Sequence, residues 1–290
     1  MSSPITEVVR AFYEDVRFPG DRPLDRDGLI LMRRLTKRAA SARDGLRVLD
    51  AGCGTGNTLV SLARAIPQAE FVGVDLSQGS LSEAGSQARD LNNVTLVHHD
   101  LMQPLQIGDF DVVLCLGVLH HTADMTRVLR NLSNALRARG AIYLWMYGKH
   151  GRYRHCLNRR LLRMLVDRDD PDAVELARRF AVEMGDGAPL AELSGEYTQK
   201  SWKQLMLGND AWVADQFLHP HEQVVDIESL AALAASAGLE LNEWLGVRPA
   251  FDAAPSALRE RFAQLNQTEQ WLATDLWLKP ESYLVQLTRP

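Results

Sequence analysis

A glycine-rich loop between an apolar run and a helical pattern constrains the fold of this chain more than any other feature. Residues 46–50 read Leu-Arg-Val-Leu-Asp, the loop contains Gly52, Gly54 and Gly56, and a helical pattern covers residues 58–65. Glycine is used where a backbone turns tightly or lies against a ligand. Many nucleotide-binding α/β folds begin with a strand, such a loop and a helix, although a turn that only packs a helix on a sheet has the same pattern. The loop therefore predicts a βαβ unit, and other residues must identify the ligand.

Strand and helix patterns alternate through the first half of the chain. Apolar runs that are typical of buried strands cover residues 46–50, 71–75, 94–97, 110–116 and 141–147. The helical patterns between them cover residues 58–65, 80–90 and 125–138. Gly140 is expected to end the last of these helices. Alternation at this spacing predicts an α/β fold with a parallel sheet and helices on both faces.

The pattern divides the chain into three parts. Helical patterns at residues 5–13 and 29–40 precede the first strand and predict an N-terminal helical lid over residues 1–42. Helices broken by turns replace the alternation in residues 149–225, which predicts an inserted helical cap. Sheet-type patterns then resume with a helix at 227–236, a strand at 239–247, helical residues at 255–270 and a strand at 282–288. The core is therefore expected to comprise residues 43–148 and 226–290.

Three carboxylates stand at the ends of the first three predicted strands. Asp50 precedes the glycine loop directly, where a carboxylate would repel a pyrophosphate but attract a ligand with an ammonium and a sulfonium group, such as S-adenosylmethionine. Asp75 follows Gly56 by 19 positions, where a carboxylate can accept hydrogen bonds from both ribose hydroxyls. Asp100 can accept a hydrogen bond from an adenine amino group. One acid for each part of the nucleoside is a far more specific signal than the loop alone.

These segments resemble the class I S-adenosylmethionine-dependent methyltransferases. The resemblance rests on Val48-Leu49-Asp50-Ala51-Gly52-Cys53-Gly54-Thr55-Gly56, Gly73-Val74-Asp75-Leu76-Ser77, His99-Asp100-Leu101 and the run from Phe110 to His121. It implies a Rossmann-like, mostly parallel seven-stranded sheet with an antiparallel last strand, and S-adenosylmethionine as cofactor, released as S-adenosylhomocysteine. It also implies these cofactor-binding residues: Asp50, Gly52, Cys53, Gly54, Gly56, Asp75, Leu76, Asp100, Leu101 and Leu116.

Methyl transfer from a sulfonium needs positioning more than it needs a catalytic motif. A general base is required only when the acceptor arrives protonated. His120 and His121 follow the fourth predicted strand and are the candidate bases, with Tyr147 at the end of the fifth strand as a third candidate catalytic residue. The alternative for the two histidines is a structural role in closing the loop.

Candidate acceptor-binding residues come from the lid and the cap. Tyr13 and His219 are expected to line the pocket, and Arg152 to bind an acceptor carboxylate or phosphate. Core packing of Tyr13 and a solvated Arg152 are the alternatives. Trp202 and Trp212 of the cap suit a hydrophobic or aromatic acceptor. No metal site is expected, because only two histidines of the 219–222 segment are close in sequence.

Composition excludes several classes of partner. The chain has 32 basic and 37 acidic residues, a net charge of −5, which disfavours nucleic acid and anionic membranes. No apolar run approaches the roughly 18 residues of a membrane helix, and the first residues have no signal-peptide core. Three scattered cysteines favour a reducing cytoplasm. We expect a cytoplasmic monomer or homodimer with no nucleic-acid or membrane partner.

The interpretation that follows is an enzyme that methylates an oxygen or nitrogen of a small molecule. The Asn/Asp-Pro-Pro-aromatic tetrapeptide of amino-methylating DNA and RNA enzymes is absent, since residues 116–119 read Leu-Gly-Val-Leu. Two alternatives stay open. One is a methyltransferase that acts on a protein, a peptide or a carrier-bound acyl chain, and the other is a catalytically silent protein that binds S-adenosylmethionine and regulates a partner.

Overall fold

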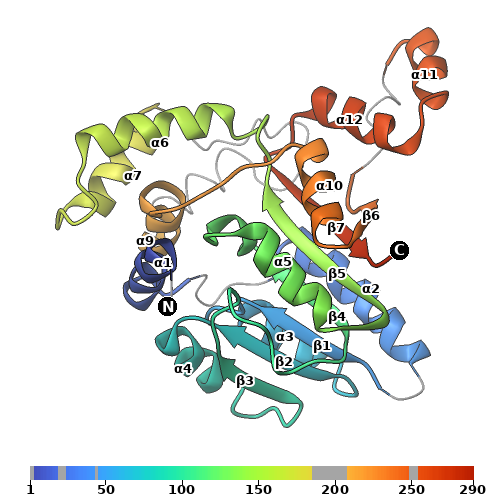
Figure 1. The fold of residues 1–290 in the computed structure, drawn as a ribbon. Helices are drawn as coiled ribbons and strands as arrows, with labels where there is room; N and C mark the ends of the chain where they lie inside the picture. Colours follow the sequence, from blue (N-terminus) through green and yellow to red (C-terminus); the bar gives the residue numbers. More distant parts are fainter. Residues whose placement is uncertain (1–2, 19–23, 43–44, 185–207, 248–253) are drawn as a thin grey trace.

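A seven-stranded sheet forms the centre of the computed structural model, which describes residues 3–18, 24–42, 45–184, 208–247 and 254–290 (Figure 1). The strands are β1 (Arg47–Ala51), β2 (Glu70–Asp75), β3 (Val94–His98), β4 (Phe110–Leu116), β5 (Leu136–Tyr147), β6 (Glu240–Trp244) and β7 (Ser282–Thr288). Their order is β3-β2-β1-β4-β5-β7-β6, and of these strands β7 alone runs opposite to the other six. The predicted mostly parallel sheet with an antiparallel last strand is confirmed.

Helices cover both faces of the sheet, because its central strands are apolar on both sides. The β4 residues Val112, Val113 and Leu114 are fully buried. One face packs against α5 (Met125–Asn134) and α10 (Ile227–Ser236), and the other against α2 (Arg26–Ser41), α3 (Asn57–Ala65) and α4 (Gln78–Gln87). The second helix of the predicted lid, α2, thus buries Leu31 and Leu35 completely in the core beside the sheet.

The predicted helix over residues 125–138 is wrong at its carboxyl end. Helix α5 ends at Asn134, and β5 already begins at Leu136. Phe110 of β4 pairs with Leu136 while Val112 pairs with Ala141, so residues 137–140 form a bulge in β5. Gly140 lies in that bulge rather than behind a helix, and a Cβ on it would lie 3.0 Å from the carbonyl oxygen of Phe110. The glycine is therefore required by close approach of two strands, a reason that the sequence pattern does not distinguish from a helix stop.

The remaining predicted elements of the core agree with the structure apart from their ends. The strands at 110–116 and 282–288 and the helix at 227–236 have the expected bounds. Strand β6 is shorter than the predicted 239–247. The helical stretch that begins near 255 divides into α11 (Ser256–Ala263) and α12 (Gln267–Leu278), because Asn266 and Glu269 form a capping box that starts a new helix.

A second group of helices lies beyond the carboxyl ends of the central strands (Figure 1). It contains α1 (Pro4–Asp15), α6 (Tyr153–Leu165), α7 (Ala173–Met184), α9 (Asp210–Val213) and the π-helical turn η2 (Ala214–Leu218). Leu162, Ala177 and Phe217 form a small core of their own within this group, and half-buried Trp212 packs against it. Trp202 lies outside the described residues.

Helix α1 is attached to the start of α4. The backbone N–H of Gln78 donates to Glu14 Oε1 at 2.9 Å, and Ser77 Oγ donates to the carbonyl oxygen of Tyr13 at 3.3 Å. The backbone N–H of Thr55, in the glycine loop, donates to the carbonyl oxygen of Phe18. These contacts hold α1 close to the loop, where it reaches the group of helices beyond the strands.

Candidate active site

The glycine loop has the backbone that its sequence predicts. Gly52, Gly54 and Gly56 have φ values of +82°, +54° and +87°, in the left-handed region that side chains disfavour. Space excludes a side chain as well, since a Cβ on Gly52 would lie 2.4 Å from Val118 Cγ2. Gly56 is also the N-cap of α3 and caps it with no side chain. The loop therefore presents bare backbone at the carboxyl end of β1.

Two carboxylates stand against this loop, that of buried Asp50 and that of half-buried Asp75. Asp75 Oδ2 accepts a hydrogen bond from the Gly54 N–H at 2.8 Å, and Oδ1 accepts one from the Ser77 N–H at 2.9 Å. Each oxygen keeps a second lone pair, so this fixed carboxylate can still accept from two hydroxyls. Asp50, at the end of β1, is 3% exposed, and burial together with the charge of Asp75 raises its pKa to about 7. Burial likewise raises the pKa of Asp75. A cation beside the pair would lower both pKa values, because it favours the ionised carboxylates.

The other predicted cofactor residues line the same edge of the sheet. Asp100 follows β3, is half-buried, and accepts the Met102 N–H at Oδ1. Leu101 is buried beside it. Leu116 ends β4 and is half-buried, Cys53 is buried in the loop, and Leu76 is half-buried after β2. Since β3, β2, β1 and β4 are consecutive in the sheet, these residues form one continuous row. Their role as cofactor ligands stays a prediction.

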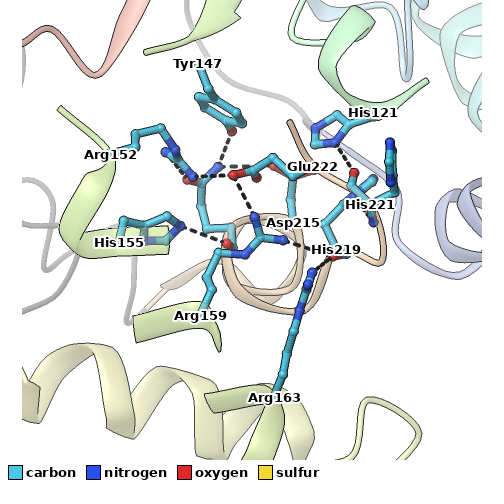
Figure 2. Close-up of polar contacts among 11 residues, drawn as sticks. His121, Tyr147, Arg152, His155, Arg159, Arg163, Asp215, His219, His221 and Glu222 are labelled. Carbon is cyan, nitrogen blue, oxygen red and sulfur yellow. Dashed lines mark hydrogen bonds and ion pairs between the residues drawn. The ribbon is translucent and has the colours of Figure 1, made fainter. Parts of the chain in front are cut away.

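Rings from four separate segments gather beyond the ends of β4 and β5, and Figure 2 shows those of His121, Tyr147 and His219. His120 and His121 lie in the short helix η1 (Leu119–His121), and the ring of His120 lies 4.3 Å from that of Tyr147. The ring of His121 stacks on His219 of the cap at 3.7 Å, and Tyr13 of α1 lies 5.3 Å from His219 between ring centroids. The fold thus brings together all three predicted catalytic residues and all three predicted acceptor residues, since Arg152 lies against Tyr147.

Hydrogen bonds assign the protons of two of these histidines. His121 Nδ1 lies 2.8 Å from the His221 carbonyl oxygen, so it donates and leaves Nε2 as the acceptor. His219 Nδ1 accepts the His221 N–H, so in the neutral ring Nε2 carries the proton. Within the described residues, His219 Nε2 and both nitrogens of His120 are buried without a hydrogen-bond partner. These are polar atoms that a bound molecule can satisfy.

Burial keeps the three rings neutral. Burial first, and then neighbouring positive charge, lowers the pKa of His120 and of His219 well below the ordinary value, and burial also lowers the pKa of His121. A neutral imidazole can accept a proton, which an imidazolium cannot. His120 therefore holds the protonation state of a base at neutral pH.

Arg152 contacts protein groups rather than facing an open pocket. Its guanidinium lies 3.7 Å over the Tyr147 ring, and Nη1 donates to Gln216 Oε1 at 3.0 Å. Together with Arg159 it also pairs with Glu222, whose Oε1 is 2.6 Å from Arg159 Nη1. Burial alone would raise the pKa of Glu222, but the two guanidiniums hold it below its ordinary value. This geometry makes Arg152 a residue that positions Tyr147.

Sequence reasoning missed the residues that join these groups. Tyr13 Oη donates to Asp215 Oδ1 at 2.9 Å, and Gln216 Nε2 donates to Tyr147 Oη at 2.7 Å. His155 Nε2 lies 3.1 Å from the Gln216 carbonyl oxygen. Asp215 and Gln216 stand in a run that reads as an ordinary helix, so they carry no signal in the sequence. Of the residues in this network that were not predicted as site residues, only Glu222 lies in a segment whose sequence is unusual, because it follows two histidines that flank a proline.

The described residues contain no group of three or more His, Cys, Asp or Glu side chains placed to hold a metal ion. A search of the same residues finds no helix with the length and apolar character needed to cross a membrane.

Comparisons with known proteins bear on the core of this site. Residues 49–142 match a family described as "Methyltransferase domain". An uncharacterised protein of Synechococcus sp. is 27% identical over 248 residues, which is 81% of this chain and 58% of that protein. A demethylmenaquinone methyltransferase of Staphylococcus saprophyticus is 30% identical over 112 residues, 38% of this chain and 48% of that enzyme. The chain spans about half the length of these curated relatives.

Two solved structures share the fold. PKMT2 from Rickettsia typhi in complex with AdoHcy has a TM-score of 0.67 at 17% identity, covering 100% of this chain and 55% of its own. Magnesium protoporphyrin IX methyltransferase from Synechocystis, with bound SAH, has a TM-score of 0.53 at 16% identity and covers 99% of this chain and 100% of its own. At these identities the likeness concerns the arrangement of the chain.

Proposed function

We propose that this chain is a class I S-adenosylmethionine-dependent methyltransferase, which transfers the methyl group of S-adenosylmethionine to an oxygen or nitrogen of a small molecule; the match of residues 49–142 to a methyltransferase domain and the strand order of the sheet support this. The observation that carries the cofactor assignment is the pair of acids at the glycine loop, Asp50 buried and Asp75 half-buried. Asp75 is fixed by two backbone N–H groups with lone pairs left for ribose hydroxyls. Asp50 is a buried acid with a pKa of about 7, which the ammonium group of the cofactor would ionise and neutralise.

For methyl transfer, the protein mainly has to hold the acceptor and the methyl donor in line. The acceptor oxygen or nitrogen attacks the methyl carbon in line, the carbon–sulfur bond breaks, and the electron pair stays on sulfur to give neutral S-adenosylhomocysteine. Holding the two reactants in line is worth roughly 7–11 kcal/mol in well-oriented systems. The proton of a hydroxyl or ammonium acceptor goes to His120, whose neutral ring has no hydrogen-bond partner among the described residues. His219 Nε2 is the donor that orients the acceptor.

The enclosed position of these histidines supports a small acceptor. His120 and His219 have no exposed surface, and Tyr13 of α1 and Asp215 of the cap meet beside them. Rings of this kind suit a partly aromatic acceptor, and the relative from Staphylococcus saprophyticus is named a demethylmenaquinone methyltransferase. The three cysteines are free, in keeping with a reducing cytoplasm as the place of action.

The experiment that tests the proposal uses methyl-labelled S-adenosylmethionine and an extract of the host, fractionated by size and solubility. Asp75→Ala serves as the blank, because loss of the ribose contact should weaken cofactor binding at least tenfold by calorimetry. Asp90→Ala, at an exposed pair with Arg64, is the matched control and should bind as the wild type does. Unchanged affinity of Asp75→Ala would contradict the cofactor site.

The fraction that takes up label decides the acceptor. Label among small organic molecules supports the proposal. Label in protein, or in acyl chains bound to a carrier, would contradict the small-molecule acceptor and favour the first alternative. Binding of S-adenosylhomocysteine without transfer of label to any fraction would favour a silent binding protein.

A further inference from the structure

The side-chain amide of Gln216 has an orientation that its neighbours fix. Gln216 Oε1 accepts a hydrogen bond from Arg152 Nη1 at 3.0 Å, and a guanidinium can only donate. The amide nitrogen therefore lies on the other side, where Nε2 donates to Tyr147 Oη at 2.7 Å and to Asp215 Oδ2 at 3.2 Å. Because Gln216 is buried, these bonds hold the amide in one of its two orientations.

This orientation decides the direction of the Tyr147 hydroxyl. Because its oxygen accepts the hydrogen bond from Gln216, its own hydrogen points elsewhere, and none of the described residues accepts it. The phenol keeps that hydrogen, since burial raises the pKa of Tyr147 above its ordinary value. A buried hydroxyl with an unused hydrogen is a donor for an oxygen of a bound molecule.

The candidate base stands beside this donor. The ring of His120 lies 4.3 Å from that of Tyr147, and both its nitrogens are buried without a hydrogen-bond partner among the described residues. The charges that act on His120 are positive, since Arg152 and Arg159 both contribute to lowering its pKa. The negative charges of the network, those of Asp215 and Glu222, oppose the lowering of the pKa at the neighbouring His121 instead.

A donor and positive charge beside a base favour oxygen over nitrogen as the methylated atom. A neutral amine has a single lone pair, which must attack the methyl carbon and cannot also accept from Tyr147. An oxyanion has further lone pairs, so it can attack with one and accept the hydroxyl with another. Hydrogen bonds to a charged oxygen are stronger than those to a neutral one, and nearby guanidiniums attract an anion and repel an ammonium group.

We propose that the acceptor is a phenol or an enol, and that Gln216 positions the Tyr147 hydroxyl to donate to its oxygen. His120 takes the proton of the acceptor hydroxyl, and the negative charge stays on the oxygen that Tyr147 contacts. That oxygen forms the bond to the methyl carbon while the carbon–sulfur bond breaks, and the electron pair stays on sulfur. Phenols and enols are the hydroxyl compounds that lose a proton to an imidazole most readily. The choice of oxygen rests on the proposed methyl transfer and selects one of its two acceptor atoms.

The test uses 4-nitrophenol, whose phenol and phenolate forms absorb at different wavelengths, added to the complex of the protein with S-adenosylhomocysteine. The bound probe should ionise at least about one pH unit lower than in water, because a hydrogen bond to the charged form favours it. 4-Nitrobenzylamine, an ammonium compound of similar shape, should bind at least about tenfold more weakly, since it gains no charge-assisted hydrogen bond. Tyr147→Phe should lose most of the shift in ionisation.

Substitutions of Gln216 test whether it acts through Tyr147. Gln216→Glu puts a carboxylate where the amide donor was, so the Tyr147 hydroxyl turns toward it and the ionisation shift should vanish. Adding Tyr147→Phe to this variant should remove little more. Gln216→Leu, which adds no charge, should lose part of the shift. Gln267→Leu, at an exposed glutamine of α12, is the matched control and should keep all of it. Circular dichroism and the affinity for S-adenosylhomocysteine establish that each variant is folded.

Several results would overturn the proposal. These are an ionisation shift that survives in Tyr147→Phe, variants of Gln216 that keep the whole shift, or tighter binding of the amine than of the phenol. A wild type that binds S-adenosylhomocysteine but no 4-nitrophenol at millimolar concentration would overturn the acceptor class and leave the cofactor site intact. A wild type that does not bind S-adenosylhomocysteine would instead contradict the proposed function itself.

Discussion

Buried Asp50 and half-buried Asp75 bring two carboxylates together at the glycine loop, an arrangement that costs free energy in the free protein. Burial and mutual repulsion both disfavour their ionised forms, which is why the pKa of Asp50 stands near 7. A protein keeps such a pair when a ligand supplies the missing positive charge. The ammonium group of S-adenosylmethionine supplies such a charge.

Cofactor affinity should rise with pH up to about 7. Below that value Asp50 of the free protein is protonated, and the proton must leave before the carboxylate can pair with the ammonium group. Calorimetry with S-adenosylhomocysteine should therefore show affinity falling up to about tenfold for each pH unit below 7, with proton release on binding. Asp50→Asn should bind weakly and without this slope. A slope that survives in Asp50→Asn would assign the proton to another group.

His120 is expected to act as the general base once an acceptor is known. General-base catalysis contributes roughly 100- to 10,000-fold, so His120→Ala should lose at least about 100-fold in kcat with unchanged affinity for S-adenosylhomocysteine. Because the pKa of His120 is lowered well below its ordinary value, the wild-type rate should fall only at acid pH, and that limb should vanish in the variant. His99→Ala, in the half-exposed loop after β3, is the control. An unaltered pH profile would leave His120 a structural role.

At the scale of elements, the site is assembled from pieces that do not belong to the sheet. Helix α1 brings Tyr13 and the turn η2 brings Asp215, and their hydrogen bond joins segments 202 residues apart. Burial raises the pKa of Tyr13 well above its ordinary value, so the phenol stays protonated and remains the donor. This contact attaches α1 to η2 beside the ring of His219.

The hydrogen bond between Tyr13 of α1 and Asp215 of η2 should give a measurable coupling free energy between these two residues. A double-mutant cycle with Tyr13→Phe and Asp215→Asn, read from denaturant unfolding, should give about 1–3 kcal/mol, as expected for a buried hydrogen bond to an acid. Tyr153→Phe, at a tyrosine 66% exposed, should change the unfolding free energy by less than about 0.5 kcal/mol. Additive effects of the two substitutions would mean that the hydrogen bond does not join the elements.

At the scale of the whole molecule, a buried ion-pair network joins α6 to the segment after η2 and contacts the end of β5 through Arg152. Glu222 receives Arg152 and Arg159, and Arg152 in turn covers Tyr147 at the end of β5. An ion pair in such a place is costly to assemble, and still more costly to break by removing one partner. The packing of Arg152 on Tyr147, and of α6 beside the end of β5, therefore depends on one glutamate.

Removal of that charge should destabilise the protein strongly. Glu222→Gln leaves two buried guanidiniums without their carboxylate and should cost about 3–5 kcal/mol in denaturant unfolding. Glu243→Gln breaks a pair with Arg34 in which both side chains are about 40% exposed, and should cost at most about 1 kcal/mol. Because the pKa of Glu222 is lowered, its contribution is present above about pH 4.5 and should be lost as pH falls further. Equal costs for the two variants would contradict the role of the network.

The sequence by itself determined the sheet and the place of the candidate cofactor site. Strand patterns, turn glycines and strand-end acids are local signals, and parallel strands necessarily bring their carboxyl ends to one edge. The strand at 110–116 and the helix at 227–236 have their expected bounds for this reason. Asp50 and Asp75 meet for the same reason.

Tertiary structure alone decided the bulge at Gly140 and the network around Glu222. A glycine that ends a helix and a glycine that lets two strands approach look alike until the partner strand is in place. Arg152 reads as a solvated cation until Glu222, 70 residues later, folds beside it. Contacts between side chains so far apart in sequence form only when the tertiary fold places both residues side by side. No local sequence pattern predicts them.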